Sequence, residues 1–112
     1  MAAGHGLETR LQDMEWEVFS SQIKKEIRMS TNAQVVGQTL ILADDKGTVS
    51  IEKYGNTIRR RVNSKGHEVI LQNVSQLTFT ELNNGVKITV KDLNGKTYML
   101  TVYSYIQWGD GG

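Results

Sequence analysis

The periodicity of the sequence changes once, near Ser30, and this change limits the fold more than any other feature. From Leu7 to Met29 there is no glycine or proline, Glu, Gln, Lys and Met are frequent, and apolar residues recur at intervals of three and four. From Ser30 to Tyr105 apolar and polar residues alternate between Gly, Asn and Asp turn signals. The pattern predicts one helix over residues 7–29, followed by antiparallel strands.

The alternating part predicts six strands in two groups. We expect these strands at residues 39–43, 48–54, 57–62, 74–82, 86–92 and 96–104. The separators DDKG, GN, NNG and LNG are short enough to close antiparallel hairpins. The remaining separator, NSKGHEVILQ, is longer and divides the strands into two successive three-stranded meanders. The sequence therefore predicts an α+β fold in which an N-terminal helix packs on antiparallel sheet.

The length of 112 residues predicts one domain with a modest hydrophobic core. We expect this domain to span residues 7–105. Residues 1–6, MAAGHG, have the small and featureless composition of an expression remnant or a disordered terminus. Residues 106–112 end in WGDGG and are expected to form a loose tail.

Charge and composition argue against several classes of function. The 13 Lys+Arg residues nearly balance the 12 Asp+Glu residues, so no global field attracts nucleic acid or anionic lipid. The sequence has no cysteine, which excludes disulfides, thiolate nucleophiles and Cys-rich metal sites. Only His5 and His67 could supply imidazole ligands, so a histidine-rich metal site is not expected. We therefore expect no metal and no cofactor.

The predicted helix has two apolar faces, whose centres lie roughly 140° apart around the axis. The earlier face consists of Leu7, Leu11, Met14 and Val18. The later face consists of Trp16, Phe19, Ile23 and Ile27. Because the later face leads directly into the strands, we expect it to be structural and to pack on the sheet. The earlier face then has no partner within the chain over its first two turns.

A run of three arginines follows the turn signal Gly55-Asn56. A two-residue turn there sets Glu52 opposite Arg59, places Arg59 and Arg61 on the polar face, and leaves Arg60 on the apolar face. A guanidinium on an apolar face is costly unless it is paired or reaches the sheet margin. We therefore expect Arg60 to be structural and to meet the margin or a helix carboxylate. The candidate carboxylates are Asp13, Glu17 and Glu26.

Two further hairpins can be placed in the same way. A two-residue turn at Asn84-Gly85 puts Leu77 and Phe79 on one apolar face with the strand at 86–92. For the last hairpin, a three-residue loop Leu93-Asn94-Gly95 with a left-handed Gly95 is preferred, because it sets apolar residues opposite one another. The expected pairs are Val90 with Tyr98, Ile88 with Leu100 and Val86 with Val102.

The stretch KYGNTIRRRVNSKGHE, residues 53–68, is the most chemically loaded part of the sequence. A phosphate-binding patch could use Arg59, Arg61 and Lys65, although a solvated strand surface is the simpler interpretation. His67 and Glu68 point apart in an extended chain, and the sequence places no nucleophile or second carboxylate beside them. We therefore predict that the protein is not an enzyme.

The same residues resemble a known family. The segments EWEVFSSQIKKEIR and VSIEKYGNTIRRRVNSKGHEVILQNVSQLTFTELNNGVKITVKDLNGKTY are similar to the ComGF family of competence proteins of Gram-positive bacteria, over residues 14–103. A more distant similarity connects the second half with J-type minor pseudopilins of type II secretion. The resemblance implies a pilin-like fold and offers no catalytic residues.

The resemblance also implies a function. It implies a membrane-anchored, non-enzymatic assembly subunit on the extracytoplasmic side of the cell membrane, which joins other competence pseudopilins of its operon in the uptake of transforming DNA. The anchor is expected outside this sequence, because nothing before Leu7 is apolar enough. Since N-terminal helices bundle in pilus-like fibres, we expect Leu7, Leu11, Met14 and Val18 to contact neighbouring subunits. The alternative is a direct DNA-binding module of the same apparatus that uses the basic strand.

Overall fold

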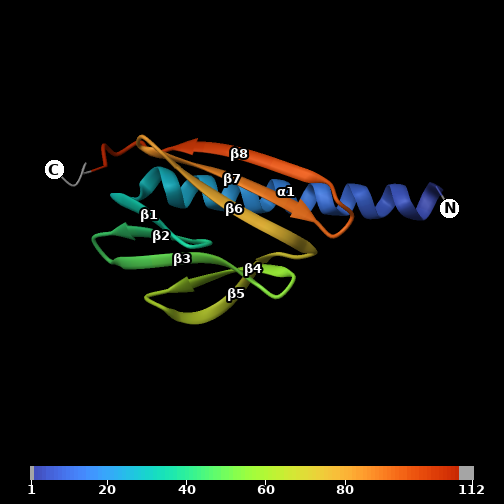
Figure 1. Ribbon diagram of the computed structural model, residues 1–112, viewed down its shortest axis with the longest axis horizontal. Coiled ribbons are helices and arrows are strands. Elements are labelled where there is room, and N and C mark those ends of the chain that lie inside the picture. Colours follow the sequence, from blue (N-terminus) through green and yellow to red (C-terminus); the bar gives the residue numbers. More distant parts are fainter. Residues whose placement is uncertain (1, 109–112) are drawn as a thin grey trace.

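The computed structural model describes the backbone of residues 2–108 and the side chains of residues 12–108. In this part of the chain it contains one helix and eight strands (Figure 1). The elements are α1 (Ala2–Met29), β1 (Asn32–Val36), β2 (Thr39–Asp44), β3 (Gly47–Tyr54), β4 (Thr57–Val62), β5 (Lys65–Leu71), β6 (Val74–Leu82), β7 (Gly85–Asp92) and β8 (Thr97–Tyr103). All strand pairs are antiparallel. The five-stranded sheet A has the order β1-β2-β3-β4-β5, and the three-stranded sheet B has the order β6-β7-β8.

The predicted fold class was wrong. The described part of the chain is mostly β, with two sheets of five and three strands, and not an α+β pilin-like fold with two three-stranded meanders. Two strands, β1 and β5, were not expected from the sequence. The helix also begins at Ala2, earlier than the predicted Leu7.

The strand β5 was hidden in the segment that the sequence analysis interpreted as a linker. Asn63 and Ser64 both have positive φ angles, 51° and 63°, so they form a tight two-residue turn and Val62 pairs with Lys65. This turn usually carries glycine, which NSKG offers only two residues later. The pairing of β4 with β5 is also irregular, with two register shifts, and β5 is an edge strand. Edge strands with polar side chains and bulges lack a clear alternating pattern.

Two predicted hairpin registers are confirmed. In the β3–β4 hairpin, Glu52 pairs with Arg59 and Ile51 pairs with Arg60. In the β7–β8 hairpin, Gly95 has a φ of 87°, and the three expected apolar pairs are present. These pairs are Val90 with Tyr98, Ile88 with Leu100 and Val86 with Val102. Both registers follow from turn chemistry, which is local in the sequence.

The β6–β7 turn lies one residue earlier than predicted. Leu82 pairs with Gly85, so the turn residues are Asn83 and Asn84, and Asn84 takes the left-handed conformation with a φ of 63°. Gly85 is needed inside β7, because a Cβ there would lie 2.6 Å from Cδ1 of Tyr103. The shift moves each pair by two residues, so the predicted apolar face is preserved.

The hydrophobic core lies between α1 and the inner faces of both sheets. From α1 it contains Trp16, Phe19, Ile23 and Ile27. From sheet A it contains Leu40, Leu42, Ile51, Ile58 and Leu71. From β6, β7 and β8 it contains Val74, Leu77, Phe79, Val86, Ile88, Val90, Tyr98 and Val102. Each fully buried large side chain contributes about 1.5 to 3 kcal/mol. The core therefore joins α1 to two sheets that share no strand ladder, and the sheets also contact each other directly, since the N–H of Val35 in β1 donates to Oε1 of Glu81 in β6.

The C-terminal segment closes one end of this core. The indole Nε1 of Trp108 and the hydroxyl of Ser104 both donate to the carbonyl of Ser30, each at 3.1 Å. The backbone N–H of Trp108 donates to Oδ1 of Asn84 at 2.7 Å. Residues 106–108 of the predicted loose tail are thus hydrogen-bonded to the helix end and to the β6–β7 turn, while residues 109–112 lie outside the described part.

Candidate functional site

The outward side of α1 exposes apolar side chains. Met14 is 63% exposed and Val18 is 68% exposed. They lie beside Val69 of the edge strand β5, which is 41% exposed. Together these residues form the α1–β5 groove, a depression of about 360 Å³ that is lined by Met14, Glu15, Val18, Val69, Ile70, Leu71 and Gln72. The groove is an apolar surface that no element of the described chain covers.

The other two residues of the earlier helix face, Leu7 and Leu11, have side chains outside the described residues. Their backbone belongs to α1, which extends beyond both sheets at its N-terminal end (Figure 1). That they continue the stripe of Met14 and Val18 stays a prediction from the sequence. The later face is different, since Trp16, Phe19, Ile23 and Ile27 are all buried.

Arg59, the first residue of the predicted basic patch, is paired within sheet A. Its Nη2 lies 2.6 Å from Oε2 of Glu52, and its Nε donates to the same oxygen at 2.7 Å. The guanidinium also lies over the ring of Tyr54, 4.0 Å from the centroid. Only 17% of the Arg59 side chain is exposed. Its charge is therefore neutralised and largely covered.

Of the other two residues of the predicted basic patch, Arg61 is hydrogen-bonded within the chain and Lys65 is exposed. Arg61 donates from Nη2 to the carbonyl of Ser64 at 2.6 Å and from Nε to the carbonyl of Gly66 at 3.1 Å. These bonds close the β4–β5 turn. Lys65 is exposed. The two arginines that the DNA hypothesis needs are thus both engaged by the chain itself.

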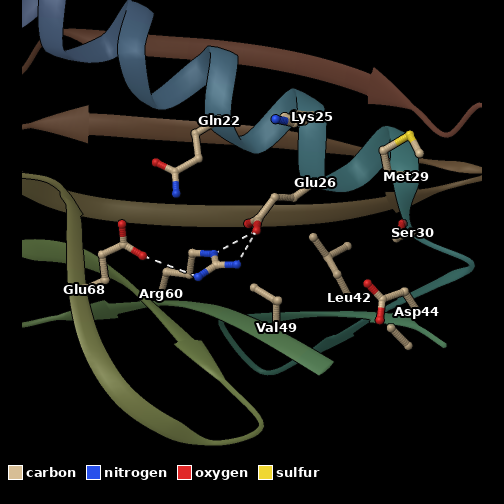
Figure 2. Close-up of a pocket in the computed structure, with 11 residues that line it drawn as sticks. Gln22, Lys25, Glu26, Met29, Ser30, Leu42, Asp44, Val49, Arg60 and Glu68 are labelled. Atoms are coloured by element: carbon tan, nitrogen blue, oxygen red, sulfur yellow. Dashed lines mark hydrogen bonds and ion pairs between the residues drawn. The ribbon is translucent and has the colours of Figure 1, made fainter. Parts of the chain in front are cut away.

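Arg60 lies on the inner side of β4, as the register requires. Its Nε and Nη2 approach Oε1 of Glu26 at 2.8 and 2.7 Å, and its Nη1 lies 3.4 Å from Oε1 of Glu68 (Figure 2). The hydrogen bond to Glu26 raises the pKa of Arg60 above its ordinary value, against a smaller opposing effect of burial. Of the three expected helix carboxylates, the guanidinium therefore binds Glu26.

This ion cluster borders a cavity between the C-terminal half of α1 and sheet A. The cavity has a volume of about 430 Å³. We call it the α1–sheet A cavity; it is lined by Gln22, Lys25, Glu26, Met29, Ser30, Leu42, Ala43, Asp44, Val49, Arg60 and Glu68. Figure 2 shows Arg60 between the carboxylates of Glu68 and Glu26, and the side chains of Val49 and Leu42 between Arg60 and Asp44. Sequence reasoning missed this site, because its residues come from separate elements of the chain.

A second polar contact fixes α1 to sheet B. Asp13 Oδ1 accepts hydrogen bonds from Nζ of Lys96 at 2.6 Å and from the hydroxyl of Tyr98 at 2.9 Å. The ring of Tyr98 also packs on Trp16, with centroids 5.0 Å apart. The hydrogen bond from Lys96 lowers the pKa of Asp13, and burial followed by the bond to Asp13 raises the pKa of Tyr98. Asp13, one of the three candidate partners of Arg60, instead binds Lys96 and Tyr98 and so attaches the helix to sheet B.

In residues 12–108, no group of three or more His, Cys, Asp and Glu side chains is arranged to hold a metal ion. The described part of α1 does not combine the length and the hydropathy that a membrane-spanning helix requires.

The fold and these surfaces define a small, mostly β domain with one long helix and an uncovered apolar groove. The family model "Putative Competence protein ComGF" matches residues 5–98. The chain therefore belongs to the ComGF family, which is associated with competence and is not a known family of enzymes. The similarity to ComGF predicted from the sequence is confirmed, whereas no comparison shows the one to J-type minor pseudopilins. Searches of curated proteins and of solved structures found no match to the chain.

Proposed function

We propose that this protein is a non-enzymatic assembly subunit, a minor pseudopilin, of the competence apparatus that takes up transforming DNA. Its partners are other competence pseudopilins of the same operon. The full protein is anchored in the cell membrane of a Gram-positive bacterium, with this domain on the extracytoplasmic side. Membership of the ComGF family supports the link to competence. The proposal concerns role and partners, and does not include a pilin-like sheet arrangement.

The exposed apolar side of α1 carries the proposal. Met14 and Val18 lie on the side of the helix that faces away from the buried stripe, next to Val69. Covering a large apolar side chain contributes about 1.5 to 3 kcal/mol, so a partner that fills the groove gains several such increments. Contiguous apolar surface of this kind marks interaction sites on soluble domains. With Leu7 and Leu11, the stripe would continue onto the projecting end of the helix.

The test uses the full-length protein in competent cells. Met14→Ser with Val18→Ser should reduce its co-purification with the other competence subunits and lower transformation. The control is Met99→Ser with Val36→Ser, which removes a methionine of the same 63% exposure and a valine of 52% exposure from other surfaces. Undiminished recovery of partners with the Met14 and Val18 variant, or an equal loss with the control, would contradict the proposal.

The alternative of direct DNA binding through the basic strand has less support. Arg59 is held by Glu52, and Arg61 is held by two backbone carbonyls. Phosphate contacts would have to replace these bonds.

A further inference from the structure

We propose that the α1–sheet A cavity binds a cationic side chain, a lysine or arginine, that a partner protein inserts. The lining contains the carboxylates Glu26, Asp44 and Glu68 and the cations Lys25 and Arg60, so one negative charge is in excess. The two cations are not equivalent. Arg60 is committed to Glu26 and Glu68. Lys25 has no ion pair among the described residues, and Figure 2 shows its ammonium on the helix side, away from Asp44 and Glu68.

Each of the three carboxylates keeps one oxygen outside the hydrogen bonds of the described chain. Glu26 accepts both Arg60 donors on Oε1, and its Oε2 is buried without a partner in residues 12–108. Asp44 accepts the N–H groups of Lys46 and Gly47 on Oδ1 alone. Glu68 contacts Arg60 only through Oε1, at 3.4 Å. Asp44 and Glu68 are exposed, whereas Oε2 of Glu26 is enclosed by the chain, so a cation that enters the cavity would donate first to Asp44 and Glu68.

The apolar part of the lining suits the stem of the same ligand. Leu42, which is 3% exposed, lines the cavity together with Val49 and Met29, of which Met29 is 60% exposed. Lysine and arginine side chains combine a flexible apolar stem with a charged head, and they lay the stem on apolar surface while the head reaches polar groups. An anion fits poorly, because the Arg60 guanidinium is already bound to two carboxylates.

That the cation comes from another competence subunit rests on the proposed function, whereas the binding chemistry can be tested on this chain alone. The probe is Nα-acetyl-L-lysine methylamide, titrated into the isotope-labelled protein and followed by NMR. The backbone amides of Ser30, Ala43 and Asp44 and the side-chain carboxyl of Glu26 should shift together along one binding curve, with a Kd weaker than about 10 mM, because partly exposed ion pairs contribute little to affinity. Nα-acetyl-L-norleucine methylamide has a similar stem without the charge and should not produce these shifts.

Matched variants locate the site. Asp44→Asn with Glu68→Gln should weaken probe binding by about fivefold, since two ion-pair partners are lost. The Asp44→Asn change keeps a side-chain oxygen that can accept the turn hydrogen bonds, so the fold should be unaffected. The control variant is Glu15→Gln with Glu17→Gln, which makes the same change in net charge on α1, outside the cavity lining. It should change binding by less than about twofold.

Equal shifts with the norleucine compound, unchanged binding by the Asp44 and Glu68 variant, or shifts that leave out Glu26 would overturn the inference. The outcome is separable from that of the proposed function. If the probe does not bind while the Met14 and Val18 variant still loses its partners, only the cavity inference fails. If the probe binds while that variant keeps its partners, only the proposed assembly surface fails.

Discussion

The three consecutive arginines of β4 have three different environments, and their removal should have different consequences. Arg59 and Arg60 each pair with a carboxylate that is mostly covered, since Glu52 is 23% and Glu26 is 19% exposed. Arg59→Ala or Arg60→Ala leaves that carboxylate unpaired, so each should lower the free energy of unfolding by about 2 to 4 kcal/mol. Arg61→Ala loses bonds to carbonyls of an exposed turn and should cost less than about 1 kcal/mol. Urea unfolding measures all three; equal losses would contradict the assigned environments.

The same arginines give a prediction for DNA. Because two of the three cations of the predicted patch are engaged within the chain, the domain should bind single-stranded or duplex DNA with a Kd of about 10⁻⁴ M or weaker at physiological salt. Fluorescence anisotropy across a salt series measures this. Submicromolar, salt-sensitive binding that disappears on Arg59→Ala with Arg61→Ala would show that the basic strand is a DNA site.

The face of β4 on which Arg60 lies could be predicted from the sequence, but the carboxylate that pairs with it could not. The Gly55-Asn56 turn fixes which face of β4 each arginine occupies, and this information is local. The choice among Asp13, Glu17 and Glu26 depends on how α1 lies across sheet A, which the tertiary packing decides. For the same reason the α1–sheet A cavity left no signal in the sequence.

At the scale of elements, α1 is attached to sheet B through Asp13, and this attachment should depend on pH. The hydrogen bond from Lys96 lowers the pKa of Asp13 from its ordinary value of 3.8 in the folded state. The stabilisation is therefore complete above pH 3.8 and is lost as the pH falls through the lower folded-state pKa. The melting temperature of the wild type should therefore approach that of Asp13→Asn as the pH falls below 3.8. A constant difference would contradict this role of Asp13.

The projecting end of α1 gives a second prediction at this scale. If Leu7 and Leu11 continue the exposed stripe, Leu7→Ser with Leu11→Ser should leave the melting temperature within about 3 °C of wild type, because surface substitutions change stability little. The same variant should associate less with partner subunits. Thermal unfolding and co-purification measure the two effects. A cooperative loss of the fold would show that these residues belong to the core.

The elements that the sequence predicted well are those with strong, local signals. The helix and the strands around Gly55 and Gly95 have clear periodicity and turn residues. The strands β1 and β5 are short or polar edge strands, and the turn at Asn63-Ser64 uses left-handed residues other than glycine. Missing these two strands changed a five-stranded sheet into a three-stranded meander, so the predicted fold class was wrong.

At the scale of the whole molecule, the two sides of α1 differ: one side packs in the core and the opposite side is exposed. Its inner side joins the two sheets through Trp16, Phe19, Ile23 and Ile27, and its outer side remains uncovered at Met14 and Val18. The molecule measures 56 × 27 × 21 Å along its principal axes, and α1 runs along the length of the molecule (Figure 1). A partner that packs on the outer side of α1 would not need to disturb the core.

The most direct test of this account is photo-crosslinking in living competent cells. A photoreactive amino acid at position 14 should form an adduct with another competence subunit, because the account places that position in the assembly surface. The same amino acid at position 99, whose native methionine is equally exposed at 63% on the outer face of sheet B, should form none. The absence of an adduct at position 14, or equal adducts at both positions, would contradict the account.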